Sequence, residues 1–111
     1  MADAYVVEIT PYAEDALREI GQYIAINLQS VQNAIRTLSM IREEIKNLRF
    51  MPARVPLTPD EPWRSEGVHR MLVKNFYVYF WIEDLNKVVR VIHVVYVGRD
   101  QKTQLSQIDM E

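Results

Sequence analysis

The chain contains no cysteine among its 111 residues. Disulfide bonds and thiolate metal sites are therefore excluded, and two histidines are too few to hold a structural zinc ion. We accordingly expect no metal ion and no other cofactor. Long apolar runs are also missing, since no stretch approaches the roughly 18 residues that a membrane-spanning helix needs, and the N-terminus lacks a signal-peptide pattern. We expect a cytoplasmic protein that does not enter the membrane.

Several catalytic patterns are missing as well. No glycine-rich phosphate loop, Ser-His-acid set or pair of carboxylates is recognisable, which gives hydrolase and nucleotide-binding functions little support. A net charge of -2 argues against a generally basic nucleic-acid binder. The charge is unevenly distributed, however, because residues 1–50 hold five basic and seven acidic side chains, whereas residues 63–99 hold six basic and three acidic. We expect any affinity for phosphate in the second half.

What the chain does have is the composition of a globular protein, with 49% hydrophobic and 25% charged residues. Its length fits one ordinary domain, so we expect residues 1–111 to fold as a single unit.

The first half predicts a short strand and two helices. Residues 5–9 are rich in Val, Ile and Tyr, which favours a strand. Thr10 can cap a helix that starts at Pro11 and ends near Leu28, and Ser30 can cap a second helix that ends near Phe50. Apolar residues recur at helical spacing in both segments, so we expect an antiparallel helical hairpin.

The second half predicts a proline-rich loop and three strands. Four prolines between residues 51 and 65 indicate an extended surface loop, whose one large anchor is Trp63. Three β-branched and aromatic runs follow at residues 68–73, 76–83 and 88–97, which predicts an antiparallel meander. The fold class is therefore α+β, in the order β-α-α-β-β-β, with an antiparallel sheet covered on one face by the helical hairpin.

Aromatic side chains alternate along the middle strand of the meander. Tyr77, Tyr79 and Trp81 share one side of it, a spacing that could also form a base-stacking platform. We interpret the series as core. The uncovered face of the sheet is then either partly covered by the loop and the C-terminal residues or is itself a binding surface.

Two segments carry a resemblance to a known family. The run GVHRMLVKNFYVYF at residues 67–80 has a glycine, a basic pair, an apolar strand, a tight turn with Asn and an aromatic-rich strand. Residues 88–100 end in YVGRD, and together these segments resemble the RelE/ParE superfamily, the toxins of type II toxin-antitoxin and plasmid-stabilisation systems. The likeness extends over about residues 5–100. It implies a small RelE/ParE-like fold with the element order given above.

The resemblance implies one of two activities. RelE-like members cleave mRNA in the ribosomal A site, with basic residues polarising a phosphate that the RNA 2'-hydroxyl attacks. ParE-like members instead inhibit DNA gyrase. In RelE-like enzymes an arginine directly follows the hairpin aromatic, and we place Val78 at that position. The long helical hairpin favours ParE-like members.

Four residues are our candidates for the active surface, namely Arg70, His93, Tyr96 and Arg99. Arginine can hold a phosphate at two points, histidine can move a proton near neutral pH, and tyrosine can stack on a base. Each also has a structural alternative: Arg70 as a solvated strand edge, His93 as a hydrogen-bonded core residue, Tyr96 as rim packing, and Arg99 in an ion pair.

Two further residues, Lys74 and Arg64, are candidates for target binding. Lys74 shares strand parity with Arg70, so we expect both on the uncovered face. Arg64 lies beside Trp63, and a loop anchor is an equally good interpretation of that pair.

These features predict the toxin of a type II toxin-antitoxin system that arrests growth by ribosome-dependent mRNA cleavage. Its partners would be the ribosome and mRNA, and a cognate antitoxin that wraps the helices and the uncovered sheet face. A non-enzymatic inhibitor of DNA gyrase and an inactive family member that only binds are the alternatives. A homodimer and a heterotetramer with the antitoxin both remain open.

Overall fold

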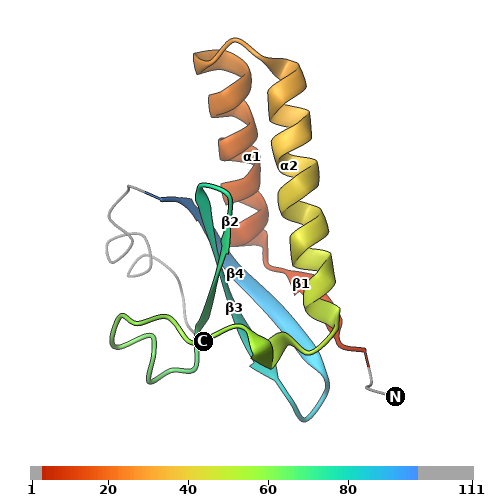
Figure 1. Ribbon diagram of the computed structural model, residues 1–111, viewed down its shortest axis with the longest axis vertical. Coiled ribbons are helices and arrows are strands. Elements are labelled where there is room, and N and C mark those ends of the chain that lie inside the picture. Colours follow the sequence, from red (N-terminus) through yellow and green to blue (C-terminus); the bar gives the residue numbers. More distant parts are fainter. Residues whose placement is uncertain (1–3, 98–111) are drawn as a thin grey trace.

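Two long helices lie on one face of a four-stranded sheet in the computed structural model, which describes residues 4–97 (Figure 1). The elements are β1 (Val6–Ile9), α1 (Pro11–Asn27), α2 (Val31–Lys46), β2 (His69–Val73), β3 (Phe76–Glu83) and β4 (Val88–Tyr96), with short 3-10 turns at Asn47–Arg49 and Pro52–Arg54. The predicted α+β class and element order are confirmed. Neither helix in this part of the chain is long and apolar enough to cross a membrane.

The sheet has the strand order β1-β4-β3-β2. The last three strands form the antiparallel meander predicted from the sequence. β1 joins the free edge of β4 in parallel, with Val6 opposite Val88, so the four-stranded sheet is mixed rather than antiparallel throughout. The residue pattern of a short strand does not specify its direction. Here the helical hairpin between β1 and β2 returns the chain so that β1 and β4 run the same way.

Both helices begin at the predicted caps. The Thr10 side chain accepts a hydrogen bond from the Ala13 N–H, and the Ser30 side chain accepts one from the Asn33 N–H. α2 ends at Lys46, earlier than predicted, and a 3-10 turn continues to Arg49. Because Leu48 in that turn is fully buried, the apolar periodicity runs past the end of the α-helix.

The main core lies between the helical hairpin and the sheet. Its fully buried side chains include Leu17 and Ile41 from the helices and Val78 and Phe80 from β3. The two helices approach closely at Gly21, where an added Cβ would lie only 2.7 Å from Leu38 Cδ1.

The opposite side of the sheet, which we call the far face, is partly covered by the proline-rich loop. Trp63 from this loop is buried in a second cluster, with Val68, Tyr79, Ile92 and Val95. Tyr77 and Trp81 pack at its margin, and the Trp81 indole N–H donates a 2.9 Å hydrogen bond to the Glu66 carbonyl. The aromatic series therefore packs under the loop, with Tyr79 fully buried and Tyr77 and Trp81 partly buried.

Candidate functional site

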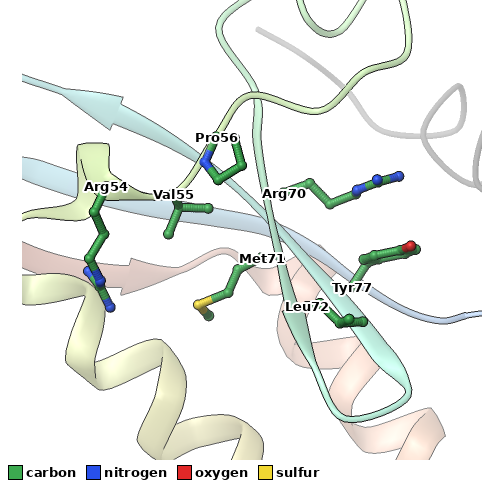
Figure 2. Close-up of a pocket in the computed structure, with 7 residues that line it drawn as sticks. All are labelled: Arg54, Val55, Pro56, Arg70, Met71, Leu72 and Tyr77. Carbon is green, nitrogen blue, oxygen red and sulfur yellow. The ribbon is translucent and has the colours of Figure 1, made fainter.

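Arg70 lies on the far face, beside the aromatic residues of β3. The strand register places it opposite Tyr79, and its guanidinium carbon is 4.1 Å from the centre of the Tyr77 ring. Figure 2 shows both side chains on the same side of the β2–β3 hairpin. The Arg70 backbone N–H donates to the Pro56 carbonyl at 3.1 Å. The loop and the tyrosines thus fix the position of Arg70, which remains partly exposed.

A shallow depression runs along β2 beside Arg70, and a second arginine, Arg54, contributes to its lining. The Arg54 Nη1 donates to the carbonyls of Phe50 and Met51, at 2.8 and 3.2 Å. The two guanidinium groups point away from one another in Figure 2. Arg54 therefore stabilises the turn that precedes the loop and does not converge with Arg70 on one ligand.

Tyr79 is fully buried beneath Arg70. Burial raises the pKa of the Tyr79 hydroxyl to about 12, and the nearby Arg70 guanidinium offsets only part of this rise. An ordinary tyrosine is already neutral near pH 7, and the raised pKa keeps the Tyr79 hydroxyl protonated in mild alkali as well.

The raised pKa of Tyr79 predicts a loss of stability in alkali. The folded state holds the tyrosine proton above the ordinary pKa of about 10, so this stabilisation is present below pH 10 and is lost as the pH rises toward 12. We expect the free energy of unfolding of the wild-type protein to fall by up to about 2 kcal/mol more than that of Tyr79→Phe across this interval. Urea unfolding at pH 9 and pH 11.5 measures it, and equal pH dependence in both proteins would contradict the assignment.

A second concave site lies on the helix side of the sheet. It is a groove of about 550 Å³ between α1, the β2–β3 turn and the end of β4. Its lining is mostly apolar, with Ile20, Tyr23 and Phe76 among the larger side chains, and Glu19 and Lys74 supply one charge of each sign.

The groove also contains two of the predicted active-surface residues, His93 and Tyr96. His93 is buried, and its ring centre lies 5.0 Å from that of Tyr12 on α1. Tyr96 is about half exposed, and its ring packs edge-on against the Phe76 ring, with 5.7 Å between the two ring centres. His93 thus packs beneath a helix, while Tyr96 lies at the rim of the groove.

The structure does not bring the predicted active-surface residues together. Arg70 lies on the far face, whereas His93 and Tyr96 line the helix-side groove. Arg99 lies outside the described residues. Arg64 is an exposed residue of the proline-rich loop, and its neighbour Trp63 is the buried residue that anchors this loop. Within residues 4–97, no three His, Asp or Glu side chains are grouped so as to hold a metal ion.

The placement predicted for Lys74 is wrong. Strand parity puts it on the same face as Arg70, but β2 ends at Val73, and Lys74 adopts a left-handed turn conformation with a φ of 52°. Alternation does not extend into such a turn, and Lys74 lines the helix-side groove instead. Lys74 is therefore separated from Arg70.

Val78, the position compared with the arginine of RelE-like enzymes, is fully buried in the main core. An arginine there could not reach the far face. Tyr77, the neighbouring residue of β3, lies on the far face and contacts Arg70. Neither Tyr77 nor Val78 supplies a positive charge there.

Sequence comparison assigns the family. The family model described as the ParE toxin of the type II toxin-antitoxin system parDE matches residues 7–101. The chain belongs to the ParE toxin family. No curated protein matches the sequence of this toxin significantly.

Solved structures agree on the fold of the toxin. A chain from the chromosomal ParDE system of Pseudomonas aeruginosa superposes with a TM-score of 0.72 at 19% identity, covering 87% of the toxin and 100% of that chain. A chain of the Mycobacterium tuberculosis RelBE2 complex gives 0.66 at 17%, covering 89% and 98%. A free Escherichia coli RelE variant, in which two arginines are replaced, gives 0.60 at 13%, covering 91% and 92%. At these identities the likeness shows a shared RelE/ParE architecture.

Proposed function

We propose that this toxin arrests growth by binding a target protein, DNA gyrase, and not by cutting RNA. The observation that carries the proposal is the separation of Arg70 from His93 and Tyr96 on different sides of the sheet. The family match supports the same conclusion, because gyrase inhibition is the activity that the ParE-like resemblance implies.

Cleavage of RNA by its own 2'-hydroxyl needs a base, an acid and positive charge that converge on one phosphate. In the described residues, the Arg70 guanidinium rests on the Tyr77 ring, and the His93 ring packs against Tyr12. These two groups cannot act on the same phosphate in this arrangement. A surface that only binds has no such requirement.

The purified toxin tests the proposal in two parallel reactions. We expect it to inhibit DNA supercoiling by gyrase and to leave mRNA intact on translating ribosomes. Ribosome-dependent mRNA cuts without any effect on supercoiling would overturn the proposal.

Ribosome-dependent mRNA cleavage is the second candidate. It is favoured by the partly exposed Arg70 guanidinium, which lies beside the tyrosine ring of Tyr77 in an arrangement suited to a phosphate and an adjacent base. Under this alternative, Arg70→Ala would abolish the mRNA cuts, and mapping of mRNA 5' ends would detect the loss.

We also propose a cognate antitoxin as the partner that silences the toxin, with the helix-side groove as its principal contact. Among the similar solved structures are a chain from a ParDE system and a chain from a RelBE2 complex. A mostly apolar groove with a few polar groups at its rim suits the apolar face of an amphipathic helix.

Tyr23 offers a test of the groove, because it lines the groove and is half exposed. We expect Tyr23→Asp to weaken antitoxin binding by roughly tenfold to a hundredfold, since a buried aromatic contact at an interface is replaced by an unpaired carboxylate. Isothermal titration calorimetry measures the affinity. Leu85→Asp, at a 92% exposed position outside the groove, is the matched control, and equal affinities for both variants would exclude the groove.

A further inference from the structure

The outer edge of β2, the edge that faces away from β3, is only partly paired. Residues 56–58 of the proline-rich loop run beside this edge and form an isolated antiparallel bridge with it. The Thr58 N–H donates to the Val68 carbonyl at 2.8 Å, and the Arg70 N–H donates to the Pro56 carbonyl at 3.1 Å. The fold thus already pairs an extended segment with this edge, and the pairing stops at Pro56.

Pro56 leaves the Arg70 carbonyl without a donor, because proline has no backbone N–H. In an antiparallel strand the N–H and C=O of one residue point to the same edge, and every second residue repeats that direction. The Arg70 C=O, the Leu72 N–H and the Leu72 C=O therefore all point outward from β2. In the part of the chain that the structure describes, none of these three groups has a hydrogen-bond partner. The edge consequently offers one donor and two acceptors to an incoming strand.

The side chains along this open edge are apolar and positively charged. Leu72 is 61% exposed, and Figure 2 shows it on the same side of β2 as Arg70. Of the described residues that line the shallow depression here, two are arginines and none is acidic. Arg70 forms no ion pair with any described carboxylate. A negatively charged ligand would therefore meet a cation that has no carboxylate partner of its own.

We propose that the open edge of β2 binds an extended acidic segment of a partner protein, which adds to the sheet as a further antiparallel strand. Strand addition combines main-chain hydrogen bonds with contacts of alternate side chains. Because Arg70 and Leu72 are two residues apart on one face, the segment carries an acidic residue beside Arg70 and an apolar residue two positions away beside Leu72.

The unpaired backbone groups favour a peptide over a nucleic acid at this edge. Two of the three groups are carbonyls, which need donors, and a phosphate chain offers only acceptors. A peptide backbone supplies both. The site is separate from the groove proposed for the antitoxin, which lies on the helix side of the sheet. Its tests use neither gyrase nor antitoxin, so their outcome does not depend on the proposed function.

Fluorescence anisotropy with a labelled peptide, Thr-Glu-Thr-Val-Thr-Glu-Thr, tests the proposal. We expect saturable binding, weakened about tenfold or more when Lys replaces Glu in the peptide or when the toxin carries Arg70→Glu. Arg64→Glu reverses an exposed charge on the proline-rich loop, outside the depression, and should bind the peptide like the wild type. The lack of binding at roughly several hundred micromolar peptide, or equal binding by Arg70→Glu and Arg64→Glu, overturns the proposal.

N-methylated peptides separate strand addition from simple charge attraction. In an antiparallel added strand the N–H groups of Glu and Val face β2, so methyl groups on those nitrogens should abolish binding, whereas methyl groups on the Thr nitrogens should not. Hydrogen exchange of the Leu72 amide should slow about tenfold or more when the unmodified peptide binds. Equal binding by the two methylated peptides, or unchanged exchange at Leu72, overturns the proposal.

Two other occupants of the edge have their own signatures in these measurements. A Leu72 amide that is already protected in the toxin alone would show that the toxin's own chain fills the edge. Binding of single-stranded DNA, but not of the acidic peptide, that Arg70→Glu abolishes would assign the edge to nucleic acid. Either result would overturn the proposal.

Discussion

Val78→Arg should unfold the chain or lower its melting temperature sharply, whereas Tyr77→Arg, one residue away, should not. The Val78 side chain is fully buried in the core between sheet and helices. An arginine there would bury an unpaired charge, at a cost of about 3–5 kcal/mol or more. Domains of this size have free energies of unfolding of about 5–15 kcal/mol, so this one change removes the whole margin of a domain at the lower end of that range and about a third of it at the upper end.

Tyr77→Arg is the matched control for Val78→Arg. Tyr77 lies on the far face and is only partly buried, so its replacement keeps the added charge in contact with water. Circular dichroism and thermal melting separate the two variants. A folded Val78→Arg protein with a melting temperature near that of the wild type would show that the side-chain directions assigned to β3 are wrong.

Trp63→Ala should cost about 3–5 kcal/mol, the second largest effect that we expect. Trp63 is the only member of the second cluster that comes from the loop before Gly67. Its loss would release the loop from the far face, give Tyr79 access to water, and lower the pKa of that tyrosine from about 12 toward its ordinary value. Urea unfolding measures the stability, and the tyrosinate absorbance at 295 nm follows the titration.

Trp81→Phe is a suitable comparison for Trp63→Ala. It keeps an aromatic ring at the cluster margin and removes one hydrogen bond, from the indole to the Glu66 carbonyl. Its expected cost is about 1 kcal/mol. If Trp63→Ala proved no more harmful than Trp81→Phe, the loop would not be anchored as described.

Local signals in the sequence predict much of this fold. The hydroxyls of Thr10 and Ser30 each satisfy a backbone N–H at a helix start, and this capping is fixed by residues three positions apart. The helical and strand periodicities likewise depend on neighbours along the chain. Such features require no knowledge of distant contacts, which is why the element order is confirmed.

The errors concern features that the local residue pattern does not encode, namely one long-range strand pairing and two interruptions of strand alternation. The direction of β1 depends on its pairing with β4, more than 80 residues later. The bulge near Ile92, where Tyr79 pairs with His93 and Phe80 with Val91, interrupts the alternation of β4. Lys74 turns toward the helix side because β2 ends one residue before it. Alternation inferred from the sequence assumes regular strands without a bulge or an early end.

The candidate site was therefore only partly predictable. Arg70 could be placed on the far face because it lies inside a regular strand. The contact of His93 with Tyr12 joins β4 to a helix about 80 residues earlier in the chain, so the sequence offers no local signal for it. Helical spacing also predicts the exposure of Tyr23, Ile26 and Ile35, because these residues lie outside the main apolar stripe of each helix.

The order in which a cell loses DNA and protein synthesis tests the central claim most directly. The toxin would be expressed from a tightly controlled bacterial promoter, with labelled thymidine and labelled methionine incorporation followed over the first minutes. An inhibitor of gyrase predicts that DNA synthesis falls first while protein synthesis continues, in the wild type and in the Tyr79→Phe control alike. An immediate fall in protein synthesis, relieved by Arg70→Ala, would contradict the binding mechanism and identify the toxin as a ribosome-dependent ribonuclease.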